Sequence, residues 1–269
     1  MPVRMAHILE WMDAWAPPAL AEEWDNPGLL VGDRSREVTR VMTALEITPA
    51  VIDEAIEGGA GLIVTHHPLI FGKIGQVSGD TALGRMLLRL IENRVAVFAA
   101  HTNLDRARGG TNDLLCQMLG LQNVAQLGEE KGGLGMGRLG DLPQGQSLEE
   151  LAERVRQLLG LTAVTYVGEG GTLLQQVAVC TGAGADLMEE ALRAGADVLL
   201  TGDVKHHQAR NAEEEGFCLI DGTHFGTEAP IARMMAAYLQ SRAAREGQEL
   251  TVWQARTEEV PLRCRLPEA

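Results

Sequence analysis

The chain has 269 residues, of which 45% are hydrophobic and 22% are charged, and it contains 31 glycines. This length and composition are typical of globular proteins with one large or two modest α/β lobes, and they exclude the disordered and fibrous classes. Lys and Arg number 23 against 37 Asp and Glu, a formal net charge of -14 that would repel a phosphate backbone. No basic cluster offsets this charge, so nucleic acid is not an expected partner.

The cysteines and the apolar stretches indicate the compartment. No C-x-x-C pair occurs, so we expect buried free thiols rather than a thiolate zinc site or a redox dithiol. The cysteines are Cys116, Cys180, Cys218 and Cys264. Glu10 and Asp13 interrupt the apolar N-terminal stretch, which argues against a secretory signal. No run approaches the roughly 20 apolar residues that span a bilayer, so we expect a cytoplasmic protein without membrane association.

The first elements in chain order predict a βαβ unit. Apolar residues at helical spacing predict an amphipathic helix over residues 5–16. Short β-branched runs then alternate with a helical pattern, which predicts a strand near 40–45, a helix near 49–58 and a strand at 61–65. This order is typical of an α/β fold with a parallel sheet.

A repeat organises the chain. Residues 41–65 align with residues 177–201 without a gap, and both copies predict a strand, a helix, a Gly-Ala turn and a strand that ends in Thr. Another helix and another apolar strand follow each copy. We therefore expect a duplicated βαβ unit, although the general likeness of all βαβ units would also produce a weak match.

The remaining segments complete the predicted organisation. Residues 128–146 are rich in glycine and charge, and we interpret them as the crossing into the second lobe. Ser147 and Glu150 form the signature of a capping box at the start of the next helix. The further elements predicted are a helix at 147–160, a strand near 163–167, a helix near 230–246 and a strand near 250–255.

Two adjacent histidines follow the strand at 61–65. His66 and His67 emerge where the chain leaves the sheet, at the carboxyl edge where α/β proteins bind ligands. Adjacent side chains diverge at a strand end, so one histidine facing each of two neighbouring metal ions is the natural arrangement. Two histidines on a single ion would require the turn after Thr65 to redirect one of them.

Two later strand ends each carry a histidine four residues before a carboxylate. These pairs are His101 with Asp105 and His224 with Glu228, at corresponding places of the repeat. The spacing suits chelation, or an acid that orients a ligating imidazole, although a single such pair also occurs at ordinary surfaces. Together the strand ends supply nitrogen and oxygen donors for two ions with positions left for water. The alternative is a cluster of hydrogen-bonded histidines at a lobe interface.

The second copy of the repeat lacks the histidine pair and has Gly202 and Asp203 in its place. The polar residues after this strand either face the same cleft as acid, base or anion contacts, or begin a solvated helix. They are Asp203, Lys205, His206 and His207. Asp25 and Asn26 lie in a polar turn, and capping of that turn is their simpler interpretation.

Five motifs in this order resemble the NIF-three-like proteins, also called GTP cyclohydrolase I type 2 homologues. The motifs are WDNPGLLVG (24–32), THHPLIF (65–71), AAHTNLD (99–105), TGDVKHH (201–207) and DGTHFGTE (221–228). The resemblance spans nearly the whole chain. It implies two interlinked α/β lobes with metals in the cleft between them, and a toroidal homohexamer. We expect the first lobe to comprise residues 1–127 with 222–269, and the second to comprise 128–221.

Transferred motif by motif, the resemblance implies a site for two divalent metal ions per chain. Its ligands would be His66, His67, Asp105, His224 and Glu228. Glu228 would bridge the ions, and His101 would be an outer ligand or a group that supports one. Imidazole and carboxylate donors fit zinc, manganese, iron, cobalt or nickel.

The same resemblance implies a metal-dependent hydrolase whose substrate is a purine nucleotide. Hydrolysis would need a proton carrier, and the candidates are His101, Asp203, His206 and His207. No phosphate-binding loop is present, and the candidate phosphate contacts are Lys73, Lys205 and Arg106. The alternative is a non-enzymatic metal-binding scaffold or regulatory interaction protein.

Overall fold

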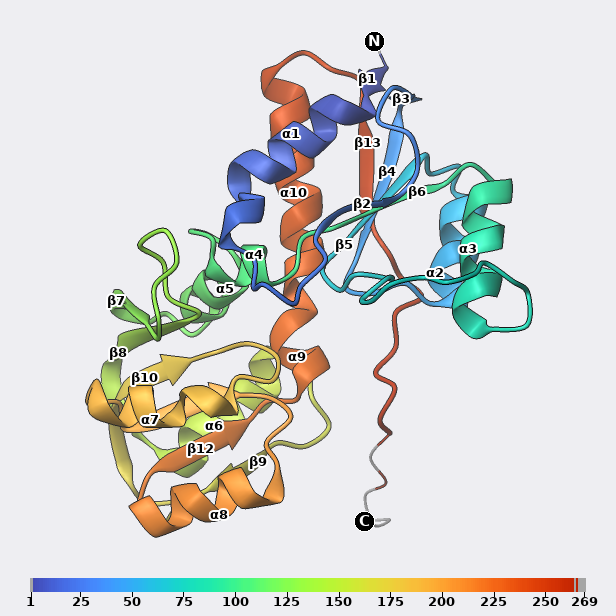
Figure 1. The fold of residues 1–269 in the computed structure, drawn as a ribbon. Coiled ribbons are helices and arrows are strands. Elements are labelled where there is room, and N and C mark those ends of the chain that lie inside the picture. The colour runs from blue at the N-terminus through green and yellow to red at the C-terminus, as the bar shows by residue number, and fades with distance from the viewer. Residues whose placement is uncertain (1, 264, 266–269) are drawn as a thin grey trace. The chain divides into compact units, whose positions relative to one another are not determined.

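The structure is a computed structural model, and it describes residues 2–263 and 265. Its contacts divide the chain into two compact units (Figure 1). The first unit comprises residues 1–107 with 231–259, and the second comprises residues 108–230 with the stretch from Val260. Each unit contains a sheet flanked by helices, so the predicted α/β fold is confirmed.

The first unit is built on a mostly parallel sheet with strand order β13-β4-β5-β6-β2. The strands are β2 (Gly28–Val31), β4 (Arg40–Ala44), β5 (Leu62–Thr65), β6 (Ala96–Ala99) and β13 (Thr251–Gln254). Only β2 runs antiparallel to its neighbour, β6. All residues of β5 and β6 are buried, as expected for parallel strands that are covered on both faces.

Helices cover both faces of this sheet (Figure 1). They include α1 (Met5–Trp15), α2 (Pro49–Glu57), α3 (Ala82–Glu92), α4 (Thr102–Arg106) and α10 (Pro230–Arg245). Met42 of β4 packs with α2 and α3, whereas the neighbouring Thr43 hydroxyl donates to the Ala232 carbonyl of α10 at 2.7 Å. The Tyr238 hydroxyl of α10 donates to the Trp11 carbonyl, which holds α1 beside α10. Short elements β1 (Val3–Arg4), η1 (Pro18–Leu20) and β3 (Glu37–Val38) connect these parts.

The second unit has a mixed sheet with strand order β7-β8-β10-β11-β12-β9. The strands are β7 (Gln122–Leu127), β8 (Gly137–Ser147), β9 (Thr165–Val167), β10 (Leu173–Val179), β11 (Val198–Thr201) and β12 (Cys218–Asp221). The strands β10, β11 and β12 are parallel, and the others are antiparallel to their neighbours. The sheet therefore has a parallel centre like that of the first unit.

The helices of the second unit also lie on both faces. They are α5 (Thr111–Met118), α6 (Leu148–Leu158), η2 (Ala185–Leu187), α7 (Met188–Arg193), α8 (His206–Glu215) and α9 (His224–Glu228). Val177 of β10 packs with α5 and α6, and the adjacent Ala178 packs with α7 and α8. The predicted capping box is confirmed, because Ser147 accepts from the Glu150 amide while Glu150 accepts from the Ser147 amide.

The repeat has the same strand register in both copies. Val41 of β4 pairs with Leu62 of β5, and their counterparts Val177 and Val198 pair in β10 and β11. Each central strand then pairs in parallel with the next strand, β6 in one unit and β12 in the other. The duplication read in the sequence therefore agrees with the backbone pairing.

Residues 128–146 are not simply a crossing, which corrects the prediction. Their second half is β8, which pairs with both β7 and β10. Gly140 in β8 lies so close to the Gln122 carbonyl that a Cβ there would be 3.2 Å from its oxygen, so the glycine permits a close approach of backbone. Because β7 belongs to the second sheet, the first segment of the first unit ends at Ala107 rather than at residue 127. The chain returns to the first unit at Ile231 rather than at residue 222.

Other expectations concern membranes and thiols. Among the helices that the structure describes, none combines the length and apolar character needed to cross a bilayer. Cys116, Cys180 and Cys218 are buried free thiols, as predicted. Burial raises the pKa of the Cys116 thiol to about 12. Cys264 lies outside the described residues.

Candidate metal centre

His66 and His67 begin the loop that follows β5. The Thr65 hydroxyl donates to the His67 carbonyl at 2.8 Å and so stabilises the turn at the end of the strand. The His66 ring is fully buried, and its Nδ1 lies 2.9 Å from the Ala100 carbonyl oxygen. A carbonyl only accepts, so Nδ1 carries the proton and Nε2 is the nitrogen that can bind a metal ion.

His101 follows β6 and is held by a buried carboxylate. Its Nδ1 lies 2.8 Å from Asp25, whose side chain is fully buried and also accepts the Thr102 amide and hydroxyl. Burial by itself would raise the pKa of Asp25, but the hydrogen bonds from His101 and Thr102 lower it to about 2. Asp25 is therefore ionised near neutral pH and fixes the His101 ring.

These side chains form one group of potential ligands within the first unit. His66, His67 and His101 each offer a ring nitrogen, and these nitrogens all lie within 4.8 Å of one another. Asp105, on α4, places an oxygen 3.5 Å from His66 Nε2. Tetrahedral ligands with bonds of about 2.1 Å lie about 3.4 Å apart, so this pair fits the coordination of one ion.

The second unit contains a matching histidine and acid on α9. His224 Nε2 lies 3.0 Å from Glu228, which is buried, and His224 Nδ1 lies 2.7 Å from Asp203. Asp221 accepts the amides of Val204 and Thr223 and so ties together the loops that carry Asp203 and His224. The ring is therefore oriented by one carboxylate and faces another.

The backbone beside His224 is strained. Thr223 has φ +60°, which is unusual for a β-branched residue, and Asp203 has φ +54°. The Thr223 side chain caps α9 by accepting the Gly226 amide, which helps to hold this conformation. Such strain is common at functional sites, where the surrounding structure fixes an unfavourable conformation.

Three of the histidines described above share one arrangement, and a fourth has an acid at a longer distance in the same place. Nδ1 of His66, His101 and His224 is bonded to an oxygen acceptor, and Nδ1 of His67 lies 3.9 Å from Glu46. Metal-binding histidines usually have such a partner, because it sets the tautomer and orients Nε2 toward the ion. Buried imidazoles and carboxylates of this kind can hold divalent metal ions.

The other predicted residues have different surroundings. His206 and His207 are exposed in the first turn of α8, and in the described part of the chain neither belongs to a potential metal-binding group. Arg106 is buried and pairs with Glu22, so it is a poor candidate for a phosphate contact. Asp203 lies beside His224 Nδ1, so it orients that ring.

Two acids near the histidines were not identified from the sequence. Asp25 also accepts the Asn26 amide, as a turn-capping residue would, but its main contacts are with His101 and Thr102. Glu258 accepts the amides of Leu45 and Glu46 at the end of β4. The signals in the sequence were the short polar turn that contains Asp25 and the family motif at 24–32, and neither indicated a contact with His101.

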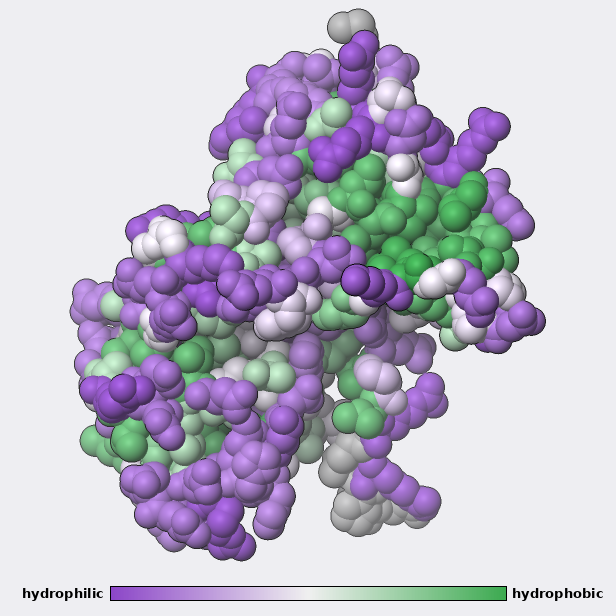
Figure 2. All heavy atoms as spheres, in the orientation of Figure 1, coloured by the Kyte–Doolittle hydropathy of each residue, from purple (hydrophilic) through white to green (hydrophobic). Residues whose placement is uncertain are grey.

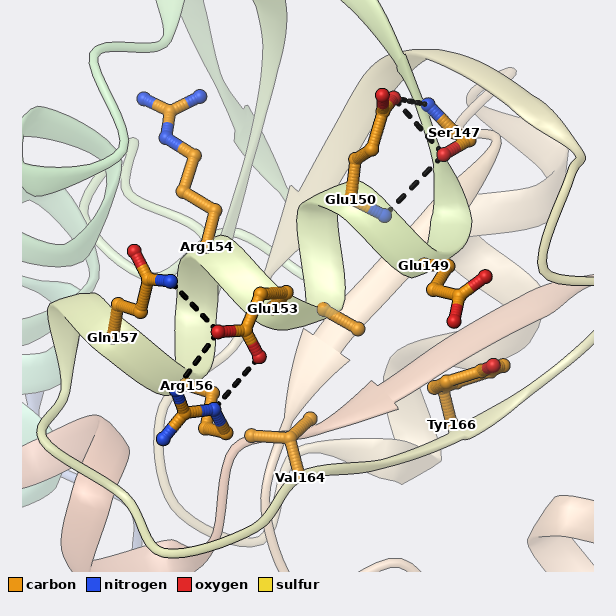
Figure 3. Close-up of a pocket in the computed structure, with 10 residues that line it drawn as sticks. Ser147, Glu149, Glu150, Glu153, Arg154, Arg156, Gln157, Val164 and Tyr166 are labelled. Carbon is orange, nitrogen blue, oxygen red and sulfur yellow. Dashed lines mark hydrogen bonds and ion pairs between the residues drawn. The ribbon is translucent and has the colours of Figure 1, made fainter.

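A surface hollow of about 730 Å³ lies along α6 in the second unit (Figure 3). Several of its charged side chains already bond to other groups of the chain. Glu153 accepts from Arg156 and Gln157, which lowers its pKa to about 2, and Glu150 is engaged with Ser147. This hollow contains no histidine or cysteine, so the chemistry is expected at the histidine groups instead.

The chain is similar to known proteins over nearly its whole length. The family model described as Duf34/NIF3 (NGG1p interacting factor 3) matches residues 3–261. A Clostridium acetobutylicum protein named GTP cyclohydrolase 1 type 2 homolog is 36% identical over 250 residues, covering 92% of this chain and 93% of the relative.

Two of the solved structures that are similar to this chain have the same TM-score. One is a Bacillus cereus protein related to NIF3, with a TM-score of 0.92 and 24% identity, covering 98% of this chain and 99% of that chain. The other is a Staphylococcus aureus hypothetical protein, with a TM-score of 0.92 and 28% identity, covering 98% and 100%. This likeness supports the α/β fold.

Proposed function

Because the chain belongs to the Duf34/NIF3 (NGG1p interacting factor 3) family, we propose that it is a dinuclear metal protein and a metal-dependent hydrolase of a nucleotide-like substrate. One observation carries this proposal. In each unit, a histidine whose Nδ1 is held by an oxygen acceptor turns Nε2 toward a carboxylate, His66 toward Asp105 and His224 toward Glu228. This arrangement is typical of histidines and carboxylates that bind a metal cation.

The metal ligands that we propose are those that the family resemblance implies. The residues that would hold the ions are His66, His67, Asp105, His224 and Glu228. These donors fit zinc, manganese, iron, cobalt and nickel alike. Divalent ions bound there would supply Lewis acidity to a substrate and to water.

The residues of the chain itself supply the proton transfer. Of the candidate proton carriers, His101 is the one with a buried carboxylate on its Nδ1. Asp25 would stabilise the positive charge that His101 gains when its other nitrogen accepts a proton. Asp203 is engaged in orienting His224, and the exposed His206 and His207 have no such support. We therefore assign the proton carrier to His101.

We further propose the toroidal homohexamer that the family resemblance implies. Light scattering of the purified protein tests this directly. A mass of one or two chains at micromolar concentration would contradict it, and neither the metal ligands nor the proton carrier depends on the outcome.

Metal content and turnover together test the main proposal. Elemental analysis should find two divalent ions per chain, and the loaded protein should hydrolyse GTP or another compound in a panel of nucleotides and phosphoesters. His67→Ala and Glu228→Ala should each lose at least one ion and reduce turnover by at least about 100-fold, since the substituted residues contact the ions. His7→Ala, which removes an imidazole from a surface ion pair with Glu246, is the control.

The metal content tests the metal centre, and the turnover tests the hydrolase. Fewer than one ion per chain, after expression in metal-supplemented medium, would contradict the metal centre. Two ions per chain without turnover of any compound would contradict the hydrolase and favour a metal-binding scaffold.

A further inference from the structure

Two exposed aromatic side chains flank the histidine group of the first unit. Trp24 is 62% exposed and Phe71 is 53% exposed. Trp24 packs on the His101 ring at 6.0 Å between centroids with an interplanar angle of 74°, and Phe71 packs on the same ring at 5.6 Å and 88°. Any ligand that covers these rings would therefore also lie beside His101.

A hydrogen bond connects the loops that carry the two aromatic residues. The Asn26 side-chain amide donates to the Ile70 carbonyl at 2.7 Å, so the residue after Asp25 binds the residue before Phe71. Asp25 holds His101 from the same turn. Trp24, Phe71 and His101 are thus placed by one hydrogen-bonded arrangement, which is a preorganised site rather than a chance exposure.

Phe71 also lines a surface hollow of about 550 Å³, formed by the loop after the histidine pair. This volume is within the range of small-molecule sites. A Cβ on Gly72 or Gly75 of this loop would meet nothing within 4 Å, so open space lies beside the loop backbone. Figure 2 shows apolar residues exposed over this part of the first unit, around β2 and α3.

The positively charged side chain of a lysine also lines this hollow. Lys73 lies in the loop two residues after Phe71, and it has no ion pair with any carboxylate of the described residues. An unpaired ammonium beside exposed aromatic rings complements a ligand that has both a flat ring and a negative charge. Such a ligand combines two contacts that the metal ions would not make.

We propose that Trp24, Phe71 and Lys73 form the binding site for the ring and an anionic group of a nucleotide-class ligand. The heteroaromatic ring packs on Trp24 and Phe71, an anionic group meets Lys73, and the rest of the ligand reaches His101. This inference rests on the proposed function, because it places the substrate beside the same histidines. It goes further by assigning the residues that select the ligand.

Binding of three probes separates the parts of this site. The probes are GTP, which has both ring and charge, guanosine, which has the ring, and tripolyphosphate, which has the charge. Affinities are measured by calorimetry and by tryptophan fluorescence quenching. Trp24→Ala and Phe71→Ala should each weaken GTP and guanosine by about 10- to 100-fold, the usual effect of losing one stacking contact. Tripolyphosphate binding should not change.

Lys73→Ala should have the opposite pattern, with GTP and tripolyphosphate weakened and guanosine unchanged. Trp24→Phe and Phe71→Tyr, which keep an aromatic ring, should retain most of the affinity for GTP. Tyr166→Ala removes an exposed aromatic ring from the second unit and should change none of the three affinities. Elemental analysis of every variant checks the metal content separately.

The outcomes distinguish this inference from the proposed function. If the alanine variants keep their metal and bind GTP within twofold of the original protein, the ring site is wrong and the metal centre stands. If the ring affinities fall as expected in protein that binds no metal, the ring site stands and the metal proposal fails. If Trp24→Ala and Phe71→Ala dissociate an oligomer without changing GTP affinity, a second copy of the chain covers the rings and the ligand site is overturned.

Discussion

The two copies of the βαβ unit share a strand register, but only the first copy has a pair of histidines directly after its central strand. In the first copy, His66 and His67 follow β5 directly. In the second, the corresponding positions are Gly202 and Asp203, and the histidine and acid are on α9, one strand later. Duplication therefore conserved the strand register and the histidine and acid after the next strand, but not the histidine pair after the central strand.

The glycines of the second copy explain this difference. A Cβ on Gly202 would lie 2.5 Å from the His224 amide nitrogen, so no side chain fits where His66 stands in the first copy. A Cβ on Gly182, which has φ +67° and corresponds to Glu46, would lie 2.2 Å from Glu228 Oε1. The second copy has lost two side chains at its strand ends, and the space is filled by the start of α9 and its carboxylate.

The largest expected effect comes from restoring a side chain at Gly202. Gly202→Ala should destabilise the second unit by about 3 kcal/mol, because the new methyl group overlaps backbone that cannot move without displacing α9. Urea unfolding measures the change in free energy. The matched control is Gly171→Ala in the same unit, where a Cβ meets nothing within 4 Å.

A loss from Gly202→Ala no larger than that of the control would show that α9 can move away from β11. The close approach of α9 would then not be the reason why the second copy lacks a histidine at this position. A large loss accompanied by loss of the metal would link the packing of α9 to its role as a ligand-bearing helix.

A smaller effect is expected at the acids that orient the histidines. Asp25→Asn should weaken metal binding by about 10- to 100-fold, because Asp25 fixes the His101 ring beside His66 and His67, and losing such a supporting carboxylate usually has an effect of this size. Asp203→Asn should cost about 10-fold or less, because the Asp203 side chain is 54% exposed and water can replace it, whereas Asp25 is fully buried. Competition with a chromophoric chelator measures both affinities.

Thermal unfolding of the two metal-free variants provides the control, since both should retain a cooperative transition. If Asp203→Asn weakened metal binding more than Asp25→Asn, burial would not determine how firmly these acids hold their histidines. The second unit would then contribute the more preorganised half of the ligands.

The sequence predicted the elements whose signals are local. The βαβ repeat, the capping box at Ser147 and the strand ends that carry His66 and His101 all follow from patterns within a few residues. The role of Asp25 did not, because it contacts a histidine 76 positions away. The strand β8 was missed because glycine usually weakens a strand, and its glycines serve close packing that appears only once β7 and β10 are in place.

The smallest expected effect concerns the helix that follows the first strand of each copy. Thr48 caps α2 by accepting the Val51 amide at 3.2 Å, whereas the corresponding Gly184 has no side chain. A Cβ on Gly184 would lie 2.3 Å from the Cys180 sulfur, so the second copy cannot use this cap and begins with the short η2 instead. Thr48→Ala should reduce the free energy of unfolding by about 1 kcal/mol, and Thr48→Ser, which keeps the oxygen, by clearly less. Equal losses in the two variants by urea unfolding would mean that the methyl group of Thr48, and not its hydrogen bond, stabilises α2.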